Sequence, residues 1–135
     1  MIAIHKPTID DYDAVRALVA EVHALHRAAR SDVYAADAHF SREYYAALLA
    51  DENGFPIAAY DGDKLVGFAS AFMKPANPNP AMLPHRIAYI DDICVHSRCR
   101  GMGIGTLLYN ETVRLAKERG ADTLMLTVWA FNESA

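Results

Sequence analysis

Three glycines at alternate positions mark the stretch of the chain that is best suited to binding chemistry. Gly101, Gly103 and Gly105 follow a β-branched, apolar segment, and Arg100 stands directly before them. Glycines lack the Cβ atoms that would keep a ligand away from the backbone, so the N–H groups here can approach an anion. A helix that begins near Ile104 would add its positive dipole end and its free N–H groups at the same point. The spacing therefore predicts a phosphate-binding loop.

Two common phosphate-binding loops do not fit this spacing. A dinucleotide-binding loop has the pattern G-x-G-x-x-G, and Thr106 stands where its third glycine belongs. A nucleoside triphosphate loop requires Gly-Lys-Ser/Thr, but no lysine occurs between Lys74 and Lys117. The glycine loop must therefore serve another phosphate-containing ligand.

The segment R-G-M-G-I-G at positions 100–105 resembles the Arg/Gln-x-x-Gly-x-Gly/Ala signature of the GNAT acyltransferase superfamily. Its surroundings are also similar: D-I-C-V-H precedes it, L-L-Y follows it, and a helix ends at Gly120 before a strand over 123–129 that leads to Asn132. The resemblance implies an α/β fold with a mixed sheet, the GNAT-like acyl-CoA N-acyltransferase fold. It also implies an acetyl-CoA-dependent N-acetyltransferase that acts on a primary amine of a small molecule or peptide by direct attack.

The same resemblance assigns residues to acetyl-CoA. The diphosphate is expected on the glycine loop, and the pantetheine arm is expected to pair with the backbone of the preceding strand, like an added strand. The implied coenzyme contacts are Ile93, Cys94, Val95, Arg100, Gly101, Met102, Gly103, Ile104, Gly105, Thr106 and Asn132. The backbone N–H of Cys94 is the expected oxyanion donor to the thioester carbonyl.

Direct attack requires a neutral amine, so a base must remove a proton from the ammonium group. Asp91 and Asp92 lie just before the expected pantetheine contacts, and alternation along a strand predicts that their side chains point to opposite faces of the sheet. We favour Asp92 as the base. In the alternative interpretation, one aspartate pairs with an arginine and the other faces solvent. His96 is a second candidate base because its usual pKa lies near neutrality.

The acceptor is expected to bind beside the first long helix, because this region commonly helps to form the acceptor pocket in the superfamily. His26 and Tyr34 are the candidate acceptor contacts. The alternative for His26 is that it is a helix C-terminal cation, which the helix dipole favours.

Hydrophobic periodicity predicts the elements that position these residues. The expected strands cover 1–5, 55–60, 64–73, 87–95 and 123–129, and the expected helices run from a Thr8 cap to about 27, from Ser41 over a short segment, and over 104–119. Asp61-Gly62-Asp63 predicts a hairpin, and four prolines between 74 and 86 predict a surface loop. The last strand, helix and strand imply a parallel, right-handed crossover.

Composition limits the class of protein. The chain has 135 residues, is 53% hydrophobic and carries a net charge of −4, which predicts a single domain over 1–135. The basic residues are scattered, so we expect no nucleic-acid partner. The sequence contains no apolar run of membrane-spanning length and no leader pattern, so we expect a cytoplasmic protein. Cys94 and Cys99 lie at neither Cys-x-x-Cys nor zinc-ligand spacing, which predicts reduced cysteines and no metal.

The sequence departs from the superfamily pattern at its end. The pattern usually continues after Asn132 with a helix carrying the tyrosine that protonates the departing thiolate, and then with two more strands, whereas this sequence stops at Ala135. We therefore expect a fold that lacks its last helix and strands, with Trp129 and Phe131 partly uncovered. Three interpretations remain open: a chain cut short, a non-catalytic CoA-binding or interaction protein, and a homodimer that covers the exposed strand.

Overall fold

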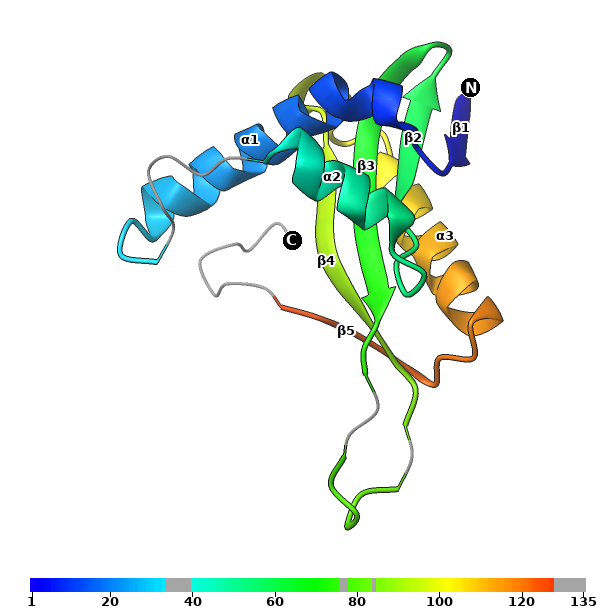
Figure 1. Cartoon of the computed structure of the whole chain (residues 1–135). Coiled ribbons are helices and arrows are strands. Elements are labelled where there is room, and N and C mark those ends of the chain that lie inside the picture. The colour runs from blue at the N-terminus through cyan, green and yellow to red at the C-terminus, as the bar shows by residue number, and fades with distance from the viewer. Residues whose placement is uncertain (34–39, 76–77, 84, 128–135) are drawn as a thin grey trace.

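The computed structural model describes residues 1–33, 40–75, 78–83 and 85–127. Five strands form one mixed sheet in the order β1-β2-β3-β4-β5, in which the first four are antiparallel and β4 and β5 are parallel. The strands are β1 (Ile2–His5), β2 (Ile57–Asp61), β3 (Lys64–Met73), β4 (Ile87–Val95) and β5 (Thr123–Leu126). This arrangement confirms the expected mixed sheet and its parallel final pair (Figure 1).

Helices cover both faces of the sheet (Figure 1). Helices α1 (Tyr12–Ala29) and α2 (Arg42–Ala50) lie on one face, and α3 (Ile104–Glu118) lies on the other. Two 3-10 turns complete the order, η1 (Ile9–Asp11) before α1 and η2 (Ser97–Cys99) between β4 and α3. Of the helices in the described part of the chain, none combines the length and the apolar character that crossing a bilayer requires.

Tyrosines join α1 and α2 to each other on the first face. The Tyr45 ring is fully buried, and its hydroxyl donates to the Thr8 carbonyl oxygen at 2.7 Å. The Tyr12 hydroxyl donates to the Phe40 carbonyl oxygen at 2.6 Å. The expected cap at the start of this region forms in part, because the Asp11 carboxylate accepts the Thr8 N–H at 2.9 Å. The residues that follow the cap form a 3-10 turn before the α-helix begins.

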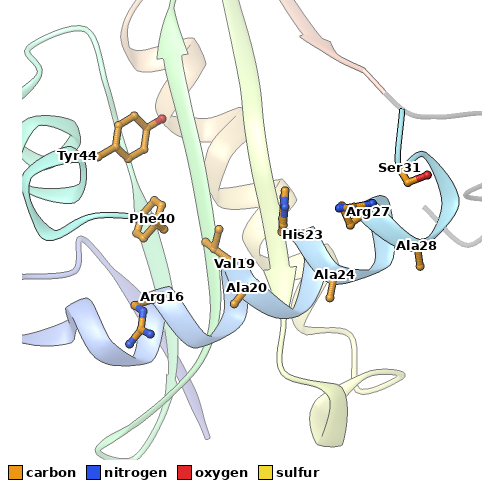
Figure 2. A pocket seen from close by; sticks show the side chains of 10 residues that line it. All are labelled: Arg16, Val19, Ala20, His23, Ala24, Arg27, Ala28, Ser31, Phe40 and Tyr44. Atoms are coloured by element: carbon orange, nitrogen blue, oxygen red, sulfur yellow. The ribbon is translucent and has the colours of Figure 1, made fainter. Parts of the chain in front are cut away.

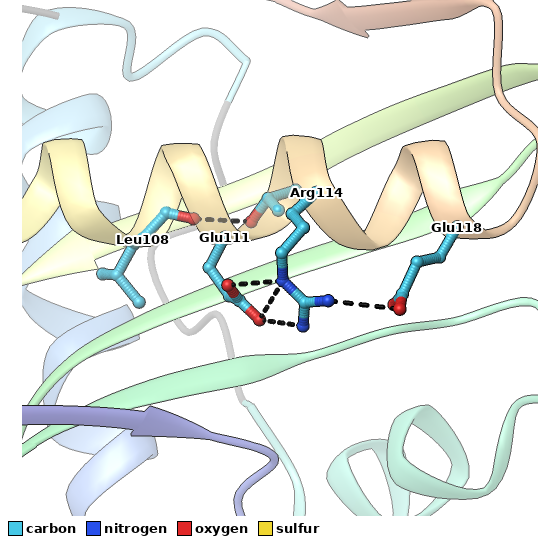
Figure 3. Close-up of polar contacts among 5 residues, drawn as sticks. Leu108, Glu111, Arg114 and Glu118 are labelled. Atoms are coloured by element: carbon cyan, nitrogen blue, oxygen red, sulfur yellow. Dashed lines mark hydrogen bonds and ion pairs between the residues drawn. The ribbon is translucent and has the colours of Figure 1, made fainter.

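Helix α3 packs tightly on the second face. Ile104 and Leu108 are buried against the sheet, and a Cβ added to Gly67 of β3 would lie only 2.9 Å from the Leu108 Cδ1 atom. The opposite side of the helix carries charges in solvent, where Arg114 pairs with the carboxylates at positions 111 and 118 (Figure 3). This amphipathic pattern explains why the 3.6-residue period located the helix correctly.

The described residues of the segment from 74 to 86 extend from one end of the sheet, as the prolines of this segment predicted (Figure 1). Its two ends are held together where the Lys74 N–H donates to the Ile87 carbonyl oxygen at 2.8 Å. The strand expected over 123–129 is observed as Thr123–Leu126, and positions 128 and 129 lie outside the described residues.

Candidate active site

Within the described residues, β5 pairs with the first half of β4, the half that lies farther from the glycine loop. The two strands pair from Ile87 with Thr123 to Ile90 with Leu126, and no further pairs form within the described residues. On its other edge, β4 stays paired with β3 as far as Val95 opposite Gly67. The second half of β4 therefore has one edge whose N–H and C=O groups have no strand partner in the described part of the chain.

The register shows which backbone groups face that open edge. The His96 N–H donates to the Val66 carbonyl oxygen of β3 at 2.8 Å. Hydrogen-bonded pairs alternate along an antiparallel ladder, so Cys94, opposite Phe68, also directs its N–H toward β3. Ile93 and Val95 direct theirs to the open edge. The Cys94 N–H, which was the expected oxyanion donor, therefore points away from the open edge, since a shift of one residue along a strand reverses the direction of the backbone groups.

The glycine loop is open where a ligand would need space. Gly101 and Gly103 have φ of 81° and 79°, and a Cβ added to either would meet nothing within 4 Å. Gly103 is the N-cap of α3 and supplies no side chain to the first N–H groups of the helix. A Cβ added to Gly105 would lie 3.8 Å from the Val95 Cγ2 atom, so the helix start lies beside the open strand. This arrangement fits a diphosphate whose attached arm runs along β4.

The other expected coenzyme contacts differ in which of their atoms are accessible to a ligand. Ile104 is buried in the core, so only its backbone could reach a ligand, whereas Met102 and Thr106 are exposed. The guanidinium of Arg100 lies 3.5 Å from the Glu21 carboxylate of α1 and so bridges the loop to that helix. Asn132 lies outside the described residues.

A β-bulge brings both candidate aspartates to one face of the sheet. Ile90 pairs with Ala71 and Asp92 with Ser70, which leaves Asp91 as an extra residue in β4. Ile90 and Ile93 both pack toward α3, so the two aspartates between them lie on the side of α1 and α2. The expectation that Asp91 and Asp92 point to opposite faces is therefore wrong, because a bulge interrupts simple alternation.

The surroundings of the two aspartates raise the pKa of Asp92 above that of an ordinary aspartate, which makes this carboxylate a better base. Burial, and then the neighbouring Asp91 charge, raise the pKa of Asp92 to about 6. Burial also raises the pKa of Asp91. Burial raises the pKa of the Tyr44 phenol, and both carboxylates raise it further, which places Tyr44 near them. Neither aspartate forms an ion pair with any arginine in the described part of the chain, contrary to the alternative interpretation.

His96 has a structural position in the loop. Its Nδ1 accepts the Arg98 N–H at 3.1 Å, which caps the short turn η2. This contact explains why a histidine stands at the point where β4 ends. Nothing in the geometry places its ring beside the open edge, so we keep Asp92 as the candidate base.

A groove of about 860 Å³ runs along α1 toward α2 (Figure 2). It is lined by Arg16, Val19, Ala20, His23, Ala24, Arg27, Ala28, Ser31, Phe40 and Tyr44. His26 is not among the lining residues, and Tyr34 lies outside the described residues.

Sequence reasoning missed the aromatic end of this groove. The ring centroids of Phe40 and Tyr44 are 5.4 Å apart. Phe40 directly precedes the N-cap of α2, and Tyr44 lies in the first turn of that helix. The sequence signal for the helical side was present in Val19, His23 and Arg27, which recur every four residues and therefore share one face of α1. The meeting of that face with α2 depends on tertiary packing.

Comparison with known proteins agrees with this geometry. The family model described as acetyltransferase (GNAT) family matches residues 19–135. The chain belongs to this family. It is 34% identical over 97 residues to an uncharacterised N-acetyltransferase of Methanocaldococcus jannaschii, a match that covers 71% of this chain and 41% of that protein. The chain therefore matches less than half the length of this curated relative.

Solved structures share the fold. A mutant of the BH1408 protein from Bacillus halodurans is 26% identical with a TM-score of 0.91, and the match covers 98% of this chain and 85% of that chain. An aminoglycoside acetyltransferase from an uncultured soil metagenomic sample, in complex with sisomicin, is 18% identical with a TM-score of 0.73, covering 98% and 81%. At 18% identity the second similarity concerns the fold alone.

Proposed function

We propose that this chain is an N-acetyltransferase that transfers the acetyl group of acetyl-CoA to a primary amine. The observation that carries the proposal is the open edge of β4, whose Ile93 and Val95 N–H groups lie beside an unobstructed glycine loop. An amide-bearing arm can pair with that edge while its diphosphate binds the loop. A cytoplasmic location remains an expectation from the sequence.

Each group in the site has a defined task in this reaction. Asp92 takes a proton from the acceptor ammonium, because a carboxylate whose pKa is about 6 is ionised at neutral pH and is more basic than an ordinary aspartate. The amine nitrogen then attacks the thioester carbonyl carbon, and the C–S bond breaks as the amide forms. CoA leaves as its thiolate, which takes up the second proton lost by the nitrogen, directly or through water. The N–H of Ile93 or Val95 donates to the carbonyl oxygen as that oxygen gains negative charge.

The groove beside α1 and α2 is the proposed acceptor site. It contains Tyr44, which lies near Asp91 and Asp92, so an amine in this groove can reach the base. Val19 and Phe40 give the groove an apolar wall against which the carbon chain of an amine can pack.

Two measurements test the proposal. Calorimetry is expected to detect binding of acetyl-CoA, with NAD and ATP as controls that bind much more weakly. Release of CoA thiol across a panel of amines, including polyamines, amino acids, aminoglycosides and peptides, is expected to identify acceptors. Binding of acetyl-CoA without turnover of any amine would favour the non-catalytic CoA-binding protein, and absence of binding would refute the assignment.

A further inference from the structure

The α1 groove is lined by basic side chains, whereas a polycationic acceptor would require acidic ones. The lining residues include two arginines, Arg16 and Arg27, and no aspartate or glutamate lines the groove within the described residues. A wall that carries cations repels a polyamine or an aminoglycoside, because like charges brought together in a partly dry groove are costly. Within the described residues, the carboxylates of Asp91 and Asp92 act on Tyr44, at the aromatic end of the groove.

Arg27, which lines the groove, has one hydrogen-bond donor without a partner in the described part of the chain. Its Nε is buried and has no hydrogen-bond partner among residues 1–33, 40–75, 78–83 and 85–127. In the same described ranges, no carboxylate forms an ion pair with its guanidinium. A buried donor without a partner is unfavourable, so a ligand group that accepts from it would be bound strongly. Arg27 lies one turn beyond His23 on the same side of α1 (Figure 2).

The two ends of the groove thus prefer opposite charges. The aromatic end, with Tyr44 beside the aspartates, suits an ammonium group, and the Arg27 end suits an anion. Val19 lies beside the aromatic end (Figure 2), and Arg27 is eight residues further along α1, so the two ends are about 12 Å apart along the helix axis at 1.5 Å per residue. A guanidinium binds carboxylate or phosphate oxygens with paired donors.

We infer that the acceptor is a small molecule that carries an anionic oxygen group, carboxylate or phosphate, in addition to its primary amine, and that Arg27 binds this anionic group. The inference rests on the proposed function, since it names the class of acceptor that the groove receives. Arg27 is a specificity-determining residue in this view, and it takes no part in the bond changes.

The test compares acceptors that differ only in the anionic group. A series of ω-amino carboxylates of increasing chain length is assayed beside the matching carboxamides and ω-amino phosphonates, with acetyl-CoA fixed. We expect the wild-type protein to prefer an anionic acceptor over its carboxamide by about 10- to 100-fold in kcat/KM, mainly through KM, which is the effect of one charge-assisted hydrogen-bond pair. The carboxylate and phosphonate arms distinguish the two sources of the anion.

Variants of Arg27 test whether this residue causes the preference for anionic acceptors. Arg27→Met is expected to abolish the preference by lowering kcat/KM for the anionic acceptors to the level of their carboxamides, and Arg27→Lys is expected to restore part of it. Arg114→Met is the matched control, because it removes the same charge from the solvent-facing side of α3, on the other face of the sheet (Figure 3). Thermal unfolding of each variant identifies any loss of folding.

Failure of the inference and failure of the proposed function give different results. Carboxamides acetylated as well as the anionic amines, or a preference unchanged in Arg27→Met, would overturn the inference and leave the acetyltransferase assignment intact. If no amine is acetylated, the proposed function fails. Equilibrium dialysis of the ω-amino carboxylates against wild-type protein and Arg27→Met then decides the inference, because equal binding to both proteins would overturn it.

Discussion

Replacement of Asp92 by asparagine is expected to change activity and stability in opposite directions. The pKa of the Asp92 carboxyl is raised from 3.8 to about 6 by burial and by Asp91. Above about pH 6 the group is ionised in both folded and unfolded chains, and the folded state is destabilised by up to ~3 kcal/mol relative to an unperturbed aspartate. Below about pH 4 both states are protonated and the cost disappears. Asparagine removes the charge, so the variant should gain up to that amount at pH 8 and little at pH 4.

The activity of this variant should fall because the general base is lost. We expect a decrease in kcat/KM of about 10²- to 10⁴-fold, together with loss of the acid limb near pH 6. Asp91→Asn is the control: it removes part of the repulsion that raises the pKa of Asp92, so the acid limb should move to lower pH while activity persists. Denaturant unfolding at the two pH values and kcat/KM against pH measure both effects. Unchanged kcat/KM and pH profile in Asp92→Asn would remove Asp92 from the mechanism, and unchanged stability at pH 8 would refute the burial argument.

Glycine substitutions test the phosphate-binding loop and, separately, the packing of α3 on the sheet. Gly103→Ala should weaken acetyl-CoA binding in calorimetry, because the φ of 79° at this position strains any residue with a Cβ by about 1–2 kcal/mol. Gly62→Ala is the control: its φ is 61° in the hairpin, so the substitution should cost similar stability but leave binding unchanged. Equal loss of binding in both would contradict a specific role for the loop. Gly67→Ala should destabilise the fold by about 1–3 kcal/mol in thermal or denaturant unfolding, since its Cβ would lie 2.9 Å from Leu108; a neutral effect would show that α3 can shift.

Local patterns in the sequence located most of the elements. The strand expected over 87–95 and the helix expected to begin at Ile104 have these bounds in the structure, because β-branched runs and a 3.6-residue apolar period act over a few neighbouring residues. The parallel final pair followed from the crossover rule, and the glycine loop followed from spacing. The backbone conformation at Gly101 and Gly103 agrees with the use of glycine there.

Directions of individual groups could not be predicted in the same way. The bulge at Asp91 depends on how β3 and β4 pair, and it turned both aspartates to one face. The direction of the Cys94 N–H depends on the phase of the same ladder, which alternates with each residue. An uncertainty of one residue, harmless for the bounds of a strand, is therefore enough to misplace an oxyanion donor.

The sequence by itself determined the family, the order of the elements and the loop that can receive a diphosphate, since these depend on residue type and short spacing. Only the tertiary structure decided that β5 pairs with β4 as far as Ile90 within the described residues, that α1 and α2 form one groove, and that Arg27, which lines this groove, has a buried donor without a partner there. The physical reason is that these features arise from contacts between residues far apart in the chain. Such contacts leave no periodic signal in any short segment.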